Sequence, residues 1–295
     1  MAEQPPCDRD AVLFVSEIPF WREESGAHQR IAGVCRALQA GGFDVAVFHA
    51  SWVSAADRRR LRARFPGLAV TCPPRPLLLL RMLRRRLGLF RRTERAGAQP
   101  LGGERRWALR RYCRARRPRF LIVEYLWSAY LVEGLRDALP YPVTLLLDTH
   151  DVMHLRAARF AKRAMRGAPR IGRAEEAAVL ARFDALLAIQ AREADALRAM
   201  CPDTPVVTVG HAFRTHAPAP APVPPVRLLF VAGAGEHNRV AIQSFMDTVW
   251  PALRARHGAG VELHIGGLVC GGLDAAASPD GATLRGFVRD LEALF

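Results

Sequence analysis

The residues best suited to proton chemistry stand together as Asp148, Thr149, His150 and Asp151. They follow an apolar run at 143–147, which predicts a buried strand, so they fall at its carboxyl end. Open parallel α/β sheets bind ligands at that edge, and an imidazole there can accept or share a proton with a ligand hydroxyl. His150 is therefore our candidate catalytic residue and Asp151 a candidate substrate-binding residue. A hydrogen-bonded structural histidine or helix cap is the alternative.

A second set of candidates surrounds a glycine loop in the last quarter of the chain. Gly233 and Gly235 follow an apolar run at 228–231, and Asn238 is the expected N-cap of the next helix. Free amides and the dipole at a helix N-terminus attract phosphate, which makes these three residues candidate phosphate contacts. A tight turn without a ligand is the alternative. Asn238 stands where the third glycine of a dinucleotide fingerprint would fall, which disfavours a nicotinamide or flavin enzyme.

The first half of the chain contains the elements needed to position such residues. An apolar run at 11–16 predicts a strand, a loop with Gly26 follows, and a helix from about residue 27 ends at the glycines at 41 and 42. A strand at 43–48 completes a unit typical of an open parallel α/β sheet. Further strands are expected at 68–71, 120–125, 143–148, 185–189 and 205–209.

The last part of the chain repeats this pattern. The run at 228–231 predicts a strand buried on both faces, and residues 261–265 alternate as a second strand. Between them, one helical stripe carries Ile242, Phe245, Met246, Val249 and Leu253. We therefore expect an N-terminal Rossmann-like domain at 1–216, a Pro/Ala-rich linker at 217–226, and a partial second domain at 227–295.

Composition sets limits on the class of protein. The 295 residues carry a formal net charge of +15, almost all of it from arginine, and Lys162 is the single lysine. That bias weakens any inference from basicity to a partner. The six cysteines are scattered without a C-x-x-C pair, and the N-terminus is polar and acidic, which favours a reducing cytosol over secretion. The longest apolar stretch, at 120–135, is too short and too charged to span a bilayer.

Residues 75–119 form a basic block in which Leu80, Leu83, Leu87 and Phe90 lie at helical spacing among arginines. This pattern predicts an amphipathic helix with a solvated arginine face, and an anionic membrane surface is the alternative partner for that face. Few aromatic residues accompany the charge, and no zinc or helix-turn-helix signature is present, so nucleic acid is disfavoured.

We expect no metal site. His150 and His154 are four residues apart, and Asp148 or Asp151 could complete a set of ligands, but no further histidine or cysteine has a suitable spacing. We expect no cofactor either.

The order of these elements resembles the family 4 glycosyltransferases of the GT-B fold. The most specific segment is FVAGAGEHNRVAIQSFMDTVWPALRARHGAGVELHIGG, with an asparagine before a helix of the type N-x-x-A-x-x-x-F-x-x-x-V-W-P-x-L and a strand that closes in a glycine pair. The histidine at a strand end and the segment FDALLAIQAREADAL are also typical of the family, whose members in this branch are bacterial.

This resemblance implies two Rossmann-like domains with parallel sheets that face a cleft. It implies transfer of a sugar from a nucleoside-diphosphate sugar to a glycan or lipid-linked acceptor, with retention of configuration and no obligatory metal. His150 would touch the reacting sugar, Gly26 would lie near donor phosphate or acceptor, and Gly233, Gly235 and Asn238 would line the diphosphate. The enzyme would be cytoplasmic, with peripheral binding at the inner face of the plasma membrane.

The family's paired-glutamate donor element would fall beyond residue 295, so we expect a truncated second domain and weak or absent donor binding and activity. The alternative function is a non-catalytic half-enzyme that binds a partner or a membrane surface through its arginines at 81–117.

Overall fold

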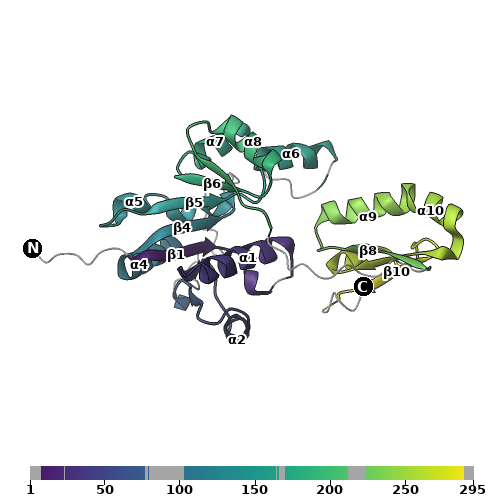
Figure 1. Cartoon of the computed structure of the whole chain (residues 1–295), viewed down its shortest axis with the longest axis horizontal. Coiled ribbons are helices and arrows are strands. Elements are labelled where there is room, and N and C mark those ends of the chain that lie inside the picture. Colours follow the sequence, from purple (N-terminus) through teal and green to yellow (C-terminus); the bar gives the residue numbers. More distant parts are fainter. Residues whose placement is uncertain are drawn as a thin grey trace, which may run out of the picture. The chain divides into compact units, whose positions relative to one another are not determined.

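A computed structural model describes residues 8–22, 24–76, 79, 103–163, 165, 170–211 and 224–288. The chain forms two compact units, residues 1–159 with 168–213 and residues 160–167 with 214–295 (Figure 1). Each unit contains its own parallel β-sheet and its own hydrophobic core.

The sheet of the first unit has seven parallel strands in the order β3-β2-β1-β4-β5-β6-β7. The strand order reverses between β1 and β4, which is the switch point where such sheets bind ligands at their carboxyl edge. The strands are β1 (Asp8–Ser16), β2 (Asp44–His49), β3 (Ala69–Thr71), β4 (Pro118–Glu124), β5 (Thr144–Asp148), β6 (Ala185–Ala188) and β7 (Val206–Thr208).

Helices cover both faces of this sheet because its strands alternate apolar side chains between the two faces. In β1, Leu13 and Val15 face one core cluster, and Val12 and Phe14 face the other. The cluster with Val12 includes side chains of η1 (Phe20–Arg22), α1 (Gly26–Ala40) and α2 (Ala55–Arg64). The opposite cluster includes α4 (Gly103–Arg116), η2 (Leu126–Val132), α5 (Leu135–Ala138), α6 (Met153–Lys162), α7 (Arg173–Leu180) and α8 (Ala191–Met200).

Two helices that flank the carboxyl edge have well-defined starts. Ser25 is the N-cap of α1, and its hydroxyl accepts a hydrogen bond of 3.4 Å from the amide of His28. α6 is capped by a residue far from it in the sequence, because the buried carboxylate of Glu176 accepts 2.7 Å hydrogen bonds from the amides of Met153 and His154. A carboxylate at a helix N-terminus is also favoured by the helix dipole.

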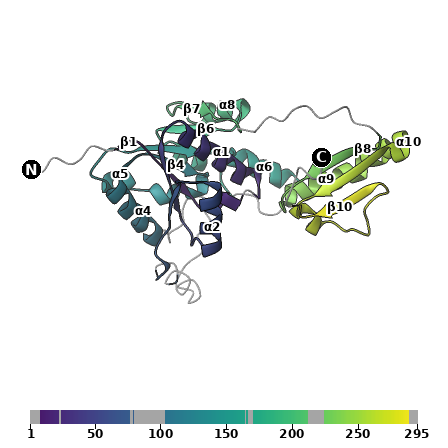
Figure 2. The same cartoon turned by 60° about the horizontal axis from the view of Figure 1, so that its bottom comes forward.

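The second unit has a three-stranded parallel sheet in the order β10-β9-β8. Figures 1 and 2 show α9 and α10 along one face of this sheet. Its core contains Ile242, Met246, Trp250, Leu263 and Ile265. The elements are β8 (Val226–Val231), α9 (Glu236–Thr248), α10 (Trp250–His257), η3 (Gly258–Gly260), β9 (Val261–Gly266), η4 (Leu268–Gly272) and β10 (Ala282–Gly286).

Three sequence expectations for this unit are wrong. β8 is not buried on both faces, because each of its residues is half-buried or exposed and Val231 is 40% exposed. The predicted single helix is two helices, which leaves Val249 43% exposed between them and places Trp250 in the core. Gly235, and not Asn238, is the N-cap of the first of these helices, because α9 begins at Glu236.

Some expectations lie outside the described residues. These are the amphipathic helix with Leu80, Leu83, Leu87 and Phe90, and the linker at 217–226 apart from its last three residues. None of the helices that the structure describes is long and apolar enough to cross a lipid bilayer.

Candidate functional site

The carboxyl ends of β4 and β5 bring the candidate residues together. Glu124 and Asp148 are paired in the register of these two strands and are both fully buried. The next residues of each strand turn sharply, with φ of 68° at Tyr125 and 58° at His150. A positive φ is uncommon for residues other than glycine, and such strained positions concentrate at functional sites. The turn at His150 directs its ring back toward the two carboxyl groups.

Arg30 of α1 is the charge partner of Asp148. Its Nε lies 2.8 and 3.0 Å from the two carboxylate oxygens, and Nη2 lies 2.8 Å from one of them. Its Nη1 donates a 2.6 Å hydrogen bond to the carbonyl of Val209, just after β7. Both side chains of this ion pair are completely buried. The pair therefore joins α1, β5 and the segment after β7 beneath the edge of the sheet.

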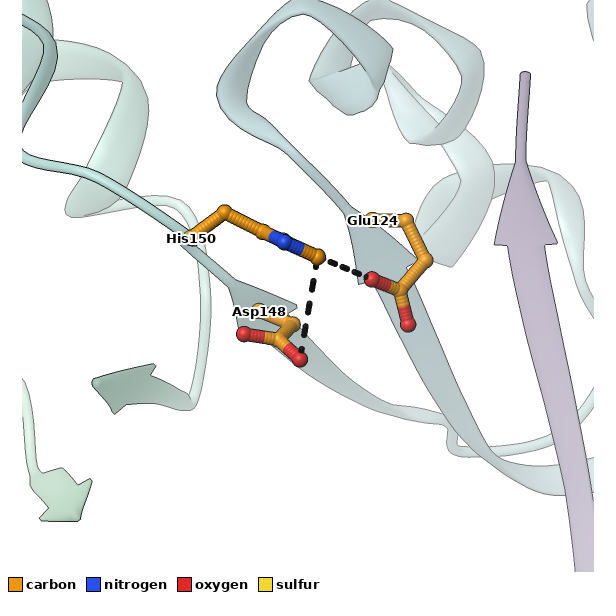
Figure 3. Close-up of side chains that lie close together, drawn as sticks. All are labelled: Glu124, Asp148 and His150. Carbon is orange, nitrogen blue, oxygen red and sulfur yellow. Dashed lines mark hydrogen bonds and ion pairs between the residues drawn. The ribbon is translucent and has the colours of Figure 1, made fainter. Parts of the chain in front are cut away.

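Glu124 and His150 form the second pair of the site. Oε2 of Glu124 lies 2.6 Å from Nε2 of His150, and an oxygen of Asp148 lies 3.9 Å from the same nitrogen (Figure 3). Figure 3 shows both carboxyl groups pointing toward the tip of the imidazole ring. The other oxygen of Glu124, Oε1, is buried and has no hydrogen-bond partner. A contact as short as 2.6 Å requires a hydrogen between the two atoms.

A stack of three aromatic rings extends from His150 toward solvent. Tyr125 stacks on His150 with ring centroids 3.8 Å apart and an angle of 12° between the planes. Trp127 stacks on Tyr125 at 3.8 Å and 15°, and it is 37% exposed. The stack fixes the plane of the imidazole, while Glu124 fixes the direction of Nε2.

Burial shifts the pKa of each titratable group in this cluster. Burial raises the pKa of Glu124 to about 8, and the charge of Arg30 opposes that rise. Burial and then the charge of Glu124 raise the pKa of Asp148 to about 6, against the effects of His150 and Arg30. Burial lowers the pKa of His150 to about 4. At neutral pH, Asp148 is thus ionised beside Arg30, while Glu124 and His150 are both uncharged.

The same three side chains are close enough together to be considered as metal ligands. One ligand atom from each of Glu124, Asp148 and His150 lies within 4.8 Å of the others. However, the buried guanidinium of Arg30 already binds both oxygens of Asp148, and a divalent cation would have to displace it. The internal hydrogen bonds therefore fit a shared proton better than a metal ion.

The other predicted residues of the first unit lie outside this cluster. The carboxylate of Asp151 forms an ion pair with Arg156, and the Asp151 amide donates a 2.7 Å hydrogen bond to the carbonyl of Thr149. Gly26 is the first residue of α1, and an added Cβ there would meet nothing within 4 Å. The N-terminus of α1 is thus open to an approaching group.

In the second unit, the predicted residues do lie together. The side-chain amide of Asn238 donates a 3.1 Å hydrogen bond to the carbonyl of Gly233, and the Asn238 backbone amide donates to Gly235 at 3.0 Å. Gly267, with φ of 96°, packs against this loop so closely that an added Cβ would lie 2.3 Å from the carbonyl oxygen of Ala232. The glycine pair after β9 thus supports the loop after β8.

Sequence reasoning missed two residues of the site, Arg30 and Glu124. Both carried a detectable signal. Arg30 occupies the apolar stripe of α1 next to Ile31, and Glu124 is the one charged residue in the otherwise apolar end of β4. A charged residue within an apolar pattern is rarely buried without a partner, so each predicted an unidentified partner.

No protein-family model matches this chain, and no curated protein matches its sequence. Solved structures do match. The apo form of the lipopolysaccharide outer core galactosyltransferase WaaB aligns with a TM-score of 0.57 at 12% identity, over 96% of this chain and 69% of that chain. Sucrose-phosphate synthase from Thermosynechococcus elongatus aligns with a TM-score of 0.60 at 15% identity, over 97% of this chain and 72% of that chain.

A variant of S. aureus TarM, in a complex that includes UDP, aligns with a TM-score of 0.60 at 6% identity, over 94% of this chain and 78% of that chain. At such identities the likeness establishes the fold. The predicted fold class is confirmed: the chain is an α/β protein with two parallel sheets whose structural neighbours are GT-B glycosyltransferases. Membership of family 4 stays a prediction.

Proposed function

We propose that this chain is a glycosyltransferase that moves a sugar from a nucleoside-diphosphate sugar to a glycan or lipid-linked acceptor. One observation carries the proposal: a buried Glu124, Asp148 and His150 cluster occupies the carboxyl edge of a GT-B-type sheet, next to the switch point between β1 and β4. Ligands bind at this edge in open α/β sheets, and His150 is the group there that can exchange a hydrogen bond with a sugar hydroxyl.

Each unit has its own proposed role in binding the substrates. In the first unit, His150 contacts the reacting sugar, Asp151 binds substrate, and Gly26 leaves the N-terminus of α1 open to an anionic group. In the second unit, the amides at Gly233 and Gly235, before α9, receive the diphosphate. Such amides stabilise the charge that develops on the leaving phosphate.

Further parts of the proposal come from the family resemblance. Transfer retains the anomeric configuration, and neither a metal nor another cofactor is obligatory. The enzyme works in the cytoplasm, with peripheral binding at the inner face of the plasma membrane.

Ligand-observed NMR tests the proposal, because saturation-transfer difference spectra detect weak contacts. We expect a signal from at least one of the UDP, GDP or dTDP sugars with the 295-residue chain. Asn238→Asp should reduce this signal severalfold by placing a negative charge beside the diphosphate loop. Gln243→Glu, which makes the same charge change five residues further along α9, is the matched control and should retain it. Absence of any nucleotide-sugar signal, or equal losses in both variants, would contradict the proposal.

The alternative, a non-catalytic membrane-binding half-enzyme, is favoured by one surface feature of α4. Trp107, Arg110, Arg111 and Arg114 line a hollow of about 350 Å³ on its exposed side. Trp107 is 49% exposed, and the Arg111 guanidinium lies 5.6 Å from the centre of its ring. An exposed indole beside arginines suits the boundary between anionic headgroups and acyl chains. Membrane binding without nucleotide binding would support this alternative.

A further inference from the structure

The buried cluster around His150 contains one positive and one negative charge that already neutralise each other. Arg30 is surrounded by acceptors, because Asp148 binds its Nε and Nη2 and the Val209 carbonyl binds its Nη1. Asp148 is likewise occupied by this guanidinium through both oxygens. A further negative charge on Glu124 would therefore lack a directly bonded cation.

The contacts of Glu124 indicate that its carboxyl group is neutral. Oε1 is buried without a hydrogen-bond partner, although both oxygens of a buried carboxylate require hydrogen-bond donors. A carboxylic acid has a smaller requirement, since its Oε2 hydroxyl needs only one acceptor, and Nε2 of His150 lies 2.6 Å away. The geometry thus fits an O–H that donates to an uncharged imidazole.

We propose that Glu124 is a positioning residue for His150: its carboxylic acid donates to Nε2 and thereby holds the imidazole in the tautomer with its hydrogen on Nδ1. The ring cannot tilt away from this contact without breaking its stack on Tyr125, whose centroid lies 3.8 Å away. In the described part of the chain, Nδ1 has no hydrogen-bond partner of its own. His150 therefore presents a donor, and not an acceptor, to a ligand.

This inference deepens the proposed function, and rests on it only for the identity of the ligand. A donor at Nδ1 matches a sugar hydroxyl oxygen or a phosphate oxygen. An acceptor at the same place would match only a hydroxyl group and would repel a phosphate. The direction of the Glu124 hydrogen bond thus determines which groups His150 can recognise.

Loss of one proton from the pair would reverse this arrangement. The Nδ1 hydrogen leaves to water, the Oε2 hydrogen moves to Nε2, and the pair changes from neutral to singly negative. The groups that act on His150 are Asp148 of β5, Arg30 of α1, Asp151, Glu193 of α8, and His211 after β7. A pKa of about 8 for Glu124, raised by its burial, places the reversal just above neutral pH.

Long-range ¹H–¹⁵N correlation spectra of the ¹⁵N-histidine-labelled chain report the tautomer directly, without any ligand or activity. At pH 6.5 we expect His150 with a protonated Nδ1 and a bare Nε2, and a change to the opposite tautomer with a midpoint near pH 8. The signal is assigned by its loss in His150→Gln. Glu124→Gln should abolish the pH-dependent change, because a glutamine amide can donate to Nε2 but does not titrate in this range.

Glu193→Gln is the matched control, since it also removes a carboxyl group that acts on His150, and it should leave the change in place. An Nε2–H tautomer or an imidazolium at pH 6.5 in the wild type would overturn the proposal, as would an unchanged transition in Glu124→Gln. If that variant fails to fold, the ¹³C carboxyl shift of Glu124 in the wild type decides: a midpoint near pH 8 supports the proposal and one near pH 4 refutes it. These readouts stand even if no nucleotide sugar binds.

Discussion

At the scale of single residues, burial of ionisable groups is the main feature of the first unit. Arg30, Glu124, Asp148 and His150 are all at least 96% buried. Buried groups shift toward their uncharged forms unless a partner compensates the charge. Arg30 and Asp148 compensate each other, whereas Glu124 and His150 remain neutral by sharing a hydrogen bond. Proton binding and folding are therefore coupled in this cluster.

The free energy of unfolding should fall as the pH rises from 6.5 to 8. Between its ordinary pKa of 4.5 and its folded pKa of about 8, Glu124 keeps a proton in the folded chain that it loses in the unfolded chain. Stability therefore decreases with pH in that window. His150 and His49, whose pKa values are lowered by burial to about 4, have the opposite effect, which fades as the pH rises above the ordinary histidine pKa of 6.5. One proton over 1.5 pH units corresponds to about 2 kcal/mol.

Urea denaturation at several pH values measures this slope. A Trp250→Phe background restricts tryptophan fluorescence to the first unit, where the other four tryptophans lie. Glu124→Gln should remove this fall, so that stability stays flat or rises slightly from pH 6.5 to 8. A wild-type stability that is constant or increases across this range would contradict an uncharged Glu124.

At the scale of elements, the conformation of the loop after β8 depends on the turn that follows β9. Gly267 follows β9 with a φ of 96°, and the Val269 amide donates a 3.2 Å hydrogen bond to the carbonyl of Ala232 after β8. Gly233 comes next in the chain. A displacement of the β9 turn would therefore move the loop that we propose as the diphosphate site.

Gly267→Ala should destabilise the second unit by about 2–4 kcal/mol, since its Cβ would lie 2.3 Å from a backbone oxygen at a φ that disfavours side chains. Gly271→Ala is the control, because a Cβ there meets nothing within 4 Å, and it should change stability by less than about 1 kcal/mol. Urea unfolding distinguishes the two when it is monitored by Trp250, which is buried in this unit, in a background whose other four tryptophans are replaced by phenylalanine. Equal stabilities of the two variants would show that the turn tolerates a side chain.

At the scale of the whole molecule, the formal net charge of +15 predicts less about binding partners than the positions of the arginines do. The same excess of arginine occurs on α2, as Arg59, Arg60 and Arg62, and on α4, but on α4 the Arg111 guanidinium lies over the ring of an exposed tryptophan and Arg110 and Arg114 line the same hollow. Charge alone gives weak, salt-dependent attraction to any anionic surface, whereas an apolar anchor among the charges favours a membrane.

We expect the chain to bind vesicles that contain phosphatidylglycerol and not those of phosphatidylcholine alone. The triple variant R110Q, R111Q and R114Q should lose binding by about 100-fold, at about 1 kcal/mol for each arginine near the surface. The control R59Q, R60Q and R62Q removes the same charge from α2 and should lose much less. Vesicle flotation measures both, and circular dichroism checks that both fold. Equal losses would mean that total charge, and not the α4 surface, drives binding.

Sequence patterns were enough to predict the strands of the first sheet, β8 and β9 of the second, and the position of His150 at a strand end. They were not enough to predict the break after Thr248 or the edge position of β8. Whether β8 lies at an edge of the sheet depends on which strands pair with it, and the residues of β8 alone do not determine that pairing. Asn238 is a residue type that favours the N-cap position, but in the structure its side chain donates a hydrogen bond to Gly233. The N-cap of α9 is Gly235.

The sequence by itself determined the α/β class, the glycine loops and a histidine at the carboxyl edge, because apolar periodicity and turn residues act over a few neighbours. Only the tertiary structure decided the partners of that histidine. Arg30 and Asp148 are separated by 118 positions, and Glu124 reaches His150 through strand register. Burial and hydrogen-bond geometry determine which of these groups carries the proton, and both arise only when distant segments pack together.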